Sequence, residues 1–431
     1  MKNKMKSIMA VLLVLTALLL TACGGGNSSS DDEIDVYEAA LNYEKNSNQA
    51  VVYTPLSERP NYALEEGASI EEMRDMAVKV MYDELSFLWT PLTSFTYTKT
   101  GAGADGVYYF GSDTVFAGMP YTNAGGSLFH MLDYYDYKNG VIFGLEGKDA
   151  NEVIGNNCAP AVNWGLAAVC TNISASDTGS MSEKNGFVAV GGYDISGIDR
   201  FNAQIPTVEI CNREGPQKMY SYYAQLVKAD AVMTTPTGSH AMMVLEPADV
   251  VYNEDGTIDP LKSSIIIQDQ RFGEKDITLN GQTASYRGRF DAKVTFESLY
   301  QDAYIPLRAA QLADENYKFV APKGELRTTG NTYADLKKAK VLSNFRVVKI
   351  EGKLVSDSGK TVLLKRANSI IQDYYDGTDR SMDVNRILPK EAEASDVMKS
   401  GHTYHYQISV LFANGVEQQL FDQEVKASFF K

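Results

Sequence analysis

The hydrophobic period of the chain changes near residue 230, from helical spacing to strand spacing. Before this point, Ser69-x-x-Glu72 forms a capping box ahead of apolar residues three to four apart, which predicts a helix beginning at Ser69. After it come short apolar runs separated by turn sequences, which predict strands. Helices followed by strands indicate an α+β fold. The predicted strands are 231–233, 241–245, 250–252 and 264–267, and further helices are predicted at 158–170 and 217–227.

Alternating segments then dominate the last hundred residues. They are 345–350, 361–364 and 404–412. Their spacing predicts that residues 326–431 form a separate all-β, sandwich-like domain.

The N-terminus has the pattern of an export signal. Lysines precede an apolar run over 8–20, which is shorter than the roughly 20 residues that a spanning helix needs. The run ends in Leu20-Thr21-Ala22-Cys23, which resembles a bacterial lipobox. This resemblance implies that 1–22 is a signal peptide, that Cys23 carries a lipid such as palmitate, and that 23–60 is a flexible tether on the outer face of the cell membrane. The alternative is an ordinary signal peptide with an incidental cysteine.

Charge and cysteine content exclude several classes of protein. The chain has 40 Lys and Arg against 55 Asp and Glu, a net charge of -15, so affinity for nucleic acid is not expected. A hydrophobic content of 44% is enough to build a core. Only four cysteines occur, which are too few for a disulfide scaffold or a four-thiolate zinc site once each is assigned a place.

Cys158 is the candidate nucleophile. Pro160 is tolerated only in the first turn of a helix, so it places Cys158 at or beside the N-cap. Free amides and the helix dipole would stabilise a thiolate there. The alternative is a buried structural cysteine.

The thiolate needs a base, and the chain has four histidines. His240 stands at the start of a predicted strand and is the first choice, with His130 in reserve. His402 and His405 are three apart in a strand-like segment, so they face opposite ways and no metal site is predicted from them. The residue that orients the imidazole is predicted to follow the next strand, with Gln268 preferred over Asp269 and Gln270.

The order of Cys158 at a helix start, His240 at a strand start and a polar residue on the next strand resembles the papain-fold cell-wall hydrolases of the NlpC and CHAP type. Gly118-Met119-Pro120-Tyr121-Thr122-Asn123-Ala124-Gly125-Gly126 resembles the family's Pro-Tyr-x-x-Gly-Gly segment, and Lys228-Ala229-Asp230 resembles its Pro-Gly-Asp turn. The resemblance covers about 60–310 and implies a papain-like domain over 61–325, with its N-terminal helix on an antiparallel sheet. Departures occur at Asn157-Cys158-Ala159-Pro160 and Ser239-His240-Ala241, where the family has Asp-Cys-Ser-Gly and Gly-His-Val.

The resemblance implies a cysteine peptidase or amidase that hydrolyses peptide or amide bonds of peptidoglycan. Its thiolate would attack the carbonyl, and the oxyanion would be held by the Cys158 N–H together with Tyr121, Asn156 or Asn157. No metal or organic cofactor is expected. The alternative is a catalytically silent papain-like lipoprotein that binds wall peptide or a surface partner. Cys170 and Cys211 remain for a disulfide with each other or for two buried free thiols.

Overall fold

The computed structural model describes residues 36–99, 106–175, 177–198, 206–235, 239–368 and 380–431. The signal sequence and Cys23 lie outside the described residues. Among the described residues, no helix combines the length and the apolar composition that crossing a bilayer requires.

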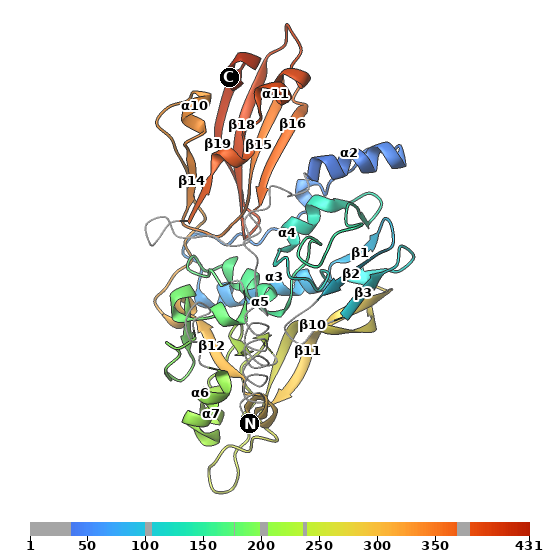
Figure 1. The fold of residues 1–431 in the computed structure, drawn as a ribbon. Helices are drawn as coiled ribbons and strands as arrows, with labels where there is room; N and C mark the ends of the chain where they lie inside the picture. The colour runs from blue at the N-terminus through green and yellow to red at the C-terminus, as the bar shows by residue number, and fades with distance from the viewer. Residues whose placement is uncertain (1–35, 100–105, 176, 199–205, 236–238, 369–379) are drawn as a thin grey trace, which may run out of the picture.

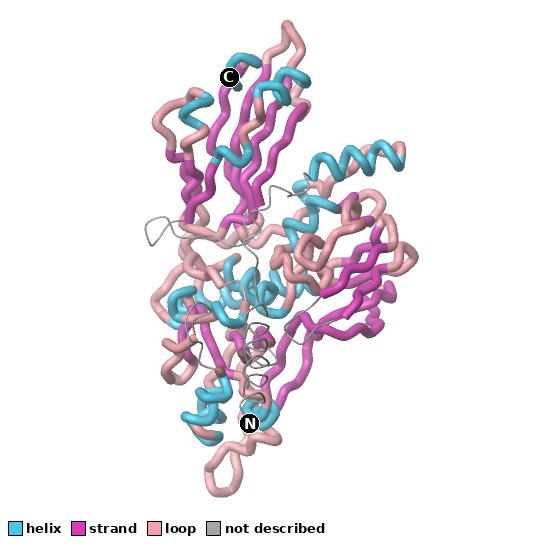
Figure 2. The backbone as a smooth tube through the Cα atoms, in the orientation of Figure 1, coloured by secondary structure: helices cyan, strands magenta, loops and turns pink. Residues whose placement is uncertain are grey.

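The described chain is mixed α+β, as predicted (Figures 1 and 2). The α-helices are α2 (Val36–Ser47), α3 (Ile70–Ser86), α4 (Leu128–Met131), α5 (Cys158–Ala167), α6 (Thr207–Glu214), α7 (Pro216–Tyr223), α8 (Phe296–Gln301), α9 (Ala310–Ala313), α10 (Tyr333–Leu336) and α11 (Glu391–Val397). Short 3₁₀ helices cover Leu56–Glu58, Leu132–Tyr134, Thr178–Ser180, Glu183–Asn185, Val384–Ile387 and Ala427–Phe430.

Among the described residues, strands form one large sheet and one separate pair in the N-terminal part, and two further sheets in the C-terminal part. The strands of the first part are β1 (Leu88–Pro91), β2 (Phe95–Lys99), β3 (Gly106–Phe110), β4 (Phe116–Ala117), β5 (Tyr135–Asp136), β6 (Val141–Ile142), β7 (Phe187–Ala189), β8 (Ala231–Thr234), β9 (His240–Val244), β10 (Ser264–Leu279), β11 (Gln282–Thr295) and β12 (Ile305–Ala309). Those of the second are β13 (Gly324–Arg327), β14 (Lys340–Ser343), β15 (Val347–Ser356), β16 (Thr361–Asn368), β17 (Arg380–Asp383), β18 (Tyr404–Phe412) and β19 (Glu417–Val425).

The large sheet has the order β5-β6-β1-β4-β11-β10-β9-β8-β12-β7 among the described strands, and β2 and β3 pair apart from it. Its centre, β11 through β12, is antiparallel. The C-terminal strands form the sheets β16-β15-β18-β19 and β13-β14-β17, accompanied by the short helices α10 and α11. Figure 1 shows these sheets above the N-terminal part.

Several predicted elements differ from the observed ones. The capping box at Ser69 is confirmed, with Ser69 and Glu72 bonded in both directions. Helix α5 begins at Cys158 as predicted but ends at Ala167 rather than at 170. The strand predicted at 250–252 is wrong, because this segment makes only isolated bridges. The apolar pattern predicts only the first four residues of the long hairpin of β10 and β11, since most of the remaining residues are polar.

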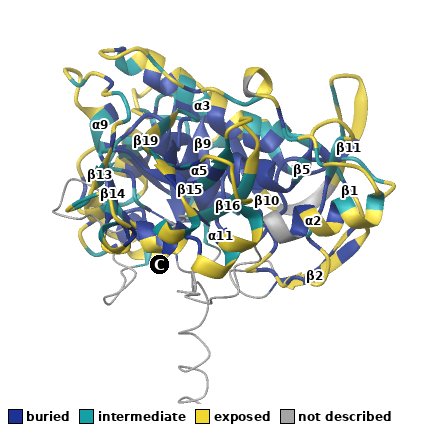
Figure 3. Ribbon diagram, turned by 90° about the horizontal axis from the view of Figure 1, so that it is seen from above, coloured by how far each residue is buried: buried dark blue, intermediate teal, exposed yellow. Residues whose placement is uncertain are grey.

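Helix α5 occupies the centre of the N-terminal part, and all of its residues are buried (Figure 3). It packs between α3 and the sheet at β9. The approach is close at Gly165, where a Cβ would lie 2.8 Å from the Ala77 carbonyl oxygen of α3 and 3.0 Å from Met243 Cε. A side chain at this position would push α5 away from α3 or from the sheet.

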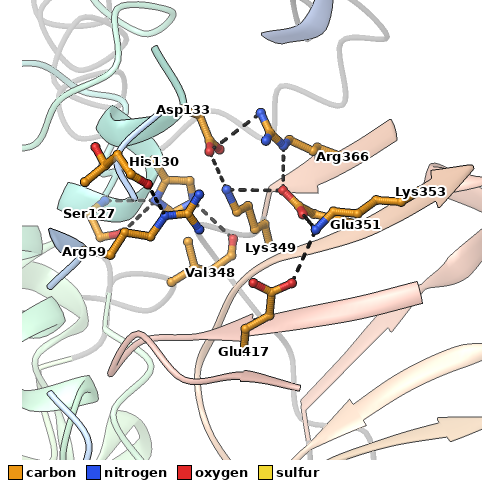
Figure 4. Close-up of polar contacts among 11 residues, drawn as sticks. Arg59, Ser127, His130, Asp133, Val348, Lys349, Glu351, Lys353, Arg366 and Glu417 are labelled. Atoms are coloured by element: carbon orange, nitrogen blue, oxygen red, sulfur yellow. Dashed lines mark hydrogen bonds and ion pairs between the residues drawn. The ribbon is translucent and has the colours of Figure 1, made fainter. Parts of the chain in front are cut away.

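A buried polar network joins the C-terminal sheets to the segment around α4 (Figure 4). Lys349 of β15 pairs with Asp133, and Arg366 Nη1 lies 3.7 Å from the same carboxylate. Glu351 accepts from Arg366 Nε at 2.6 Å and lies 3.4 Å from Lys349. These charged side chains are almost fully buried, so each needs an opposite charge nearby to offset the loss of its hydration.

A second set of contacts in the same region involves His130. Its Nδ1 accepts from the Ser127 N–H at 3.0 Å, so its Nε2 carries the proton and donates to the Val348 carbonyl at 3.1 Å. Nearby, the Arg346 guanidinium lies 3.8 Å from the ring centroid of Trp164 in α5. The C-terminal part therefore contacts the helix that carries Cys158.

Replacing Lys349 with Met should lower the free energy of unfolding by about 3 kcal/mol, because it leaves the Asp133 carboxylate buried with only a distant cation. Urea unfolding followed by tryptophan fluorescence measures the change. The control is Lys293→Met, which removes an exposed pair with Asp249 and should have little effect. Combining Lys349→Met with Asp133→Asn should recover part of the loss. Equal, small effects of Lys349→Met and Lys293→Met would contradict a stabilising role of the network.

The same interface should weaken in acid through His130. Burial lowers the pKa of its imidazole from 6.5 to about 4. The unfolded chain therefore takes up a proton between pH 6.5 and 4 that the folded chain excludes, and stability falls as the pH falls through this window. The loss should reach about 3 kcal/mol at pH 4. In His130→Gln, unfolding measured across this range should depend less steeply on pH, whereas His402→Gln, an exposed control, should keep the wild-type slope.

Candidate active site

Cys158 is the first residue of α5. The N–H groups in the first turn of this helix have no carbonyl acceptor within the helix. The Asn157 side chain does not cap the helix, because its Nδ2 donates to the Thr122 carbonyl at 3.1 Å. Pro160 has no N–H to satisfy. The N–H groups of Cys158 and Ala159 thus lie at the positive end of the helix dipole, and the Ala159 N–H helps to lower the pKa of the thiol. The predicted position of Cys158 at a helix start is confirmed.

His240 begins β9, and its imidazole lies close enough to the Cys158 thiol for each group to shift the pKa of the other. Its Nε2 lies 2.6 Å from Asp269 Oδ2 on the neighbouring strand β10. Since Nε2 is engaged by the carboxylate, Nδ1 is the nitrogen left for the sulfur. The imidazole therefore interacts with both the thiol and the carboxylate, which is the order of a catalytic triad.

The charges of this group stabilise one another. Burial by itself raises the pKa of the Cys158 thiol, but the His240 charge and hydrogen bond and the N–H groups of Ala241 and Ala159 outweigh it, so the pKa is lowered. Burial lowers the pKa of His240, yet the Cys158 charge and the hydrogen bond that the imidazole donates to Asp269 raise it to about 9. These opposite shifts favour a thiolate and imidazolium pair at neutral pH.

The structure places Asp269, and not the preferred Gln268, against the imidazole. Gln268 pairs with Met243 of β9, so its side chain lies on the opposite face of the sheet from His240. There its Nε2 donates to the Val78 carbonyl at 2.9 Å. Gln270 lies on the same side as Gln268 and donates to the Met119 carbonyl at 2.7 Å. Strand alternation thus selects the middle residue of the three candidates.

Of the three predicted oxyanion residues, Tyr121 has a side chain whose pKa responds to the thiol in the described structure. Burial and then the charge of Cys158 raise the pKa of this phenol. Its carbonyl accepts from the Tyr97 hydroxyl at 2.8 Å, and its backbone bridges to that of Asn156. The Asn156 amide donates to Glu84 at 3.1 Å, and that of Asn157 is used in the loop. The asparagines hold the segment before Cys158, and the Cys158 N–H and Tyr121 are left as donors for an oxyanion.

Two residues near the triad had no signal in the sequence. Arg289 of β11 donates from Nε to Asp269 Oδ1 at 2.9 Å and from Nη2 to Oδ2. The Tyr304 ring stands perpendicular to the His240 ring, with centroids 6.4 Å apart. Both lie at least 20 residues beyond Asp269, and only the folding of β10, β11 and β12 into one sheet brings them to the site.

The remaining histidines and cysteines lie apart from this group. His130, the reserve base, is buried against Ser127 and Val348, away from the thiol. His402 and His405 pair with Asp357 and Asp422 on the exposed side of the C-terminal sheets. No group of three potential metal ligands occurs in the described part of the chain.

Cys170 and Cys211 are free and buried, so the disulfide that the sequence left open does not form. Burial raises the pKa of each of these thiols to about 12. They differ in this respect from Cys158, whose pKa is lowered.

Comparisons with known proteins do not extend this description. No protein-family model matches the chain, and neither a curated protein nor a solved structure does so. The chemistry of the site therefore has to be argued from its geometry.

The Cys158 thiol should react with iodoacetamide at pH 6, because His240 keeps it ionised there. In His240→Ala the imidazolium is lost and burial raises the thiol pKa, so alkylation at pH 6 should slow at least about a hundredfold. Mass spectrometry of peptides measures labelling at Cys158, with the buried Cys170 as an internal control that stays unlabelled. Equal rates in the two proteins would show that His240 does not ionise the thiol.

Proposed function

We propose that this protein is an exported, lipid-anchored cysteine peptidase or amidase that hydrolyses peptide or amide bonds of peptidoglycan. The observation that carries the proposal is that His240 interacts with both Cys158 and Asp269, with the sulfur at a helix N-terminus. A helix that carries the nucleophile and packs on an antiparallel sheet supports a papain-like arrangement of the NlpC or CHAP type. The wall substrate rests on the resemblance around Tyr121, and the anchor and location in the cell membrane rest on the segment ending at Cys23.

The geometry supports a two-step acyl transfer. The Cys158 thiolate attacks the carbonyl carbon, and the tetrahedral oxyanion accepts from the Cys158 N–H and the Tyr121 hydroxyl. The His240 imidazolium protonates the leaving amine, and the C–N bond breaks to give a thioester. Neutral His240 then takes a proton from water, whose oxygen attacks the thioester, and the acid product leaves as the thiolate and imidazolium pair returns. Asp269 holds the imidazole in place throughout, and no step calls for a cofactor.

Incubation of the mature protein with purified peptidoglycan tests this proposal. Wild-type protein should release new free amino groups, and Cys158→Ala should release none. In His240→Ala the rate should fall at least about a hundredfold, because general acid and base catalysis is lost. Cys170→Ala, which removes a buried free thiol three residues after the end of α5, is the matched control and should keep activity. Absence of amine release from the wild type would overturn the proposal.

A second candidate is a catalytically silent lipoprotein that binds wall peptide or a surface partner. It is favoured by the enclosure of Cys158, which is only 5% exposed, and by Ala159-Pro160 where the family has Ser-Gly. Binding of wild type and Cys158→Ala to peptidoglycan with equal affinity, without amine release from either, would support this candidate against the enzyme.

A further inference from the structure

The carboxylate of Asp269 is enclosed between two cationic side chains. Its side chain is fully buried, and Arg289 reaches it from β11 with two N–H donors, one to each oxygen. Oδ2 also faces His240 Nε2 at 2.6 Å. Both oxygens are therefore fixed, and so is the direction from which the imidazole is held.

Sheet register builds this contact. Asp269 and Arg289 are directly opposite residues of β10 and β11, and a register shift between Ile267 and Asp269 brings them into line. The neighbouring Gly288 allows the strands to approach here, because a Cβ would lie 2.8 Å from the Asp269 carbonyl oxygen. An irregular ladder at this point is typical of sheets that direct a side chain into a site.

Arg289 also balances the charge of the site. In the ionised state, Cys158 and Asp269 carry two negative charges, and His240 and Arg289 carry two positive ones. Without Arg289 the buried group would hold a net negative charge, which favours uptake of a proton by the thiolate or the carboxylate. The other titratable groups that face Asp269 are Tyr121, Tyr286 of β11 and Tyr304, and each of these phenols is neutral at neutral pH.

We propose that Arg289 is a positioning residue of the site, which acts through Asp269 and extends the triad to a four-residue relay of Cys158, His240, Asp269 and Arg289. Arg289 keeps the carboxylate ionised and its Oδ2 directed at the imidazole, and thereby keeps the sulfur reactive on the acid side of neutrality. As a contribution to catalysis, this role rests on the proposed function. As a contribution to thiol ionisation, it can be measured without any substrate.

The chain contains a matched control in the same sheet. Arg308 of β12 holds the fully buried Asp230 with the same two donors, Nε at 2.7 Å and Nη2 at 2.6 Å. Its side chain is 22% exposed, against 26% for Arg289. Asp230 contacts Arg74 and not the thiol or the imidazole. Loss of Arg308 therefore reproduces the structural cost of losing a buried arginine and aspartate pair without touching the relay.

The experiment compares Arg289→Met, Arg289→Lys and Arg308→Met in the mature chain by rates of iodoacetamide labelling at Cys158 between pH 4 and 9. In Arg289→Met, the acid limb of the profile should move up by about one pH unit, so that labelling at pH values below the thiol pKa slows about tenfold. In Arg289→Lys the shift should be smaller than in Arg289→Met, because lysine returns the charge without the paired donors. Arg308→Met should lower the melting temperature and leave the profile unchanged.

Equal profiles in all three variants and wild type would overturn the inference and reduce Arg289 to a structural residue. If Arg289→Met does not fold, the profile of Arg289→Lys decides, since an unshifted profile there would also overturn it. A shifted profile in a protein that releases no amines from peptidoglycan would keep the relay and reject the proposed hydrolase. Amine release together with an unshifted profile would keep the proposed hydrolase and reject the relay.

Discussion

The close packing of α5 between α3 and β9 holds the candidate site together. It fixes the start of α5 against the start of β9, so the sulfur and the imidazole meet at the ends of two elements whose bodies are buried. Gly165 is needed for this approach, because the Ala77 carbonyl leaves no space for a side chain. The separation of thiol and imidazole is thus determined by packing several residues away from either group.

Charge compensation is the second constraint, and it operates in two buried places. At the candidate site, the acidic groups of Cys158 and Asp269 alternate with the basic groups of His240 and Arg289, so that each group, when ionised, lowers the cost of burying its neighbour. Around Asp133, the same alternation joins the C-terminal sheets to the N-terminal part. In both places a single neutralised member would leave an uncompensated charge out of contact with water.

The C-terminal part also contacts the buried helix α5 of the N-terminal part. Arg346 lies over Trp164, whose Nε1 donates to the Gly125 carbonyl at 2.9 Å in the segment after Tyr121. These contacts connect Arg346, the residue before β15, to segments before and after the nucleophile. The C-terminal strands therefore help to support α5, in addition to any role in binding outside partners.

Local sequence was enough to establish the features that depend on neighbours in the chain. Ser69 and Glu72 defined one helix start, Pro160 defined another and so placed Cys158, and alternation over its first residues located the strand Tyr404–Phe412. The pairing of Cys158 with His240 followed from the scarcity of histidines and the apolar strand after His240. The choice between Gln268, Asp269 and Gln270, and the presence of Arg289, required the folded sheet, because a one-residue change of register exchanges the two faces of a strand. That register is fixed by the pairing of β10 with β9 and β11, a contact between distant residues that leaves no local pattern in the sequence.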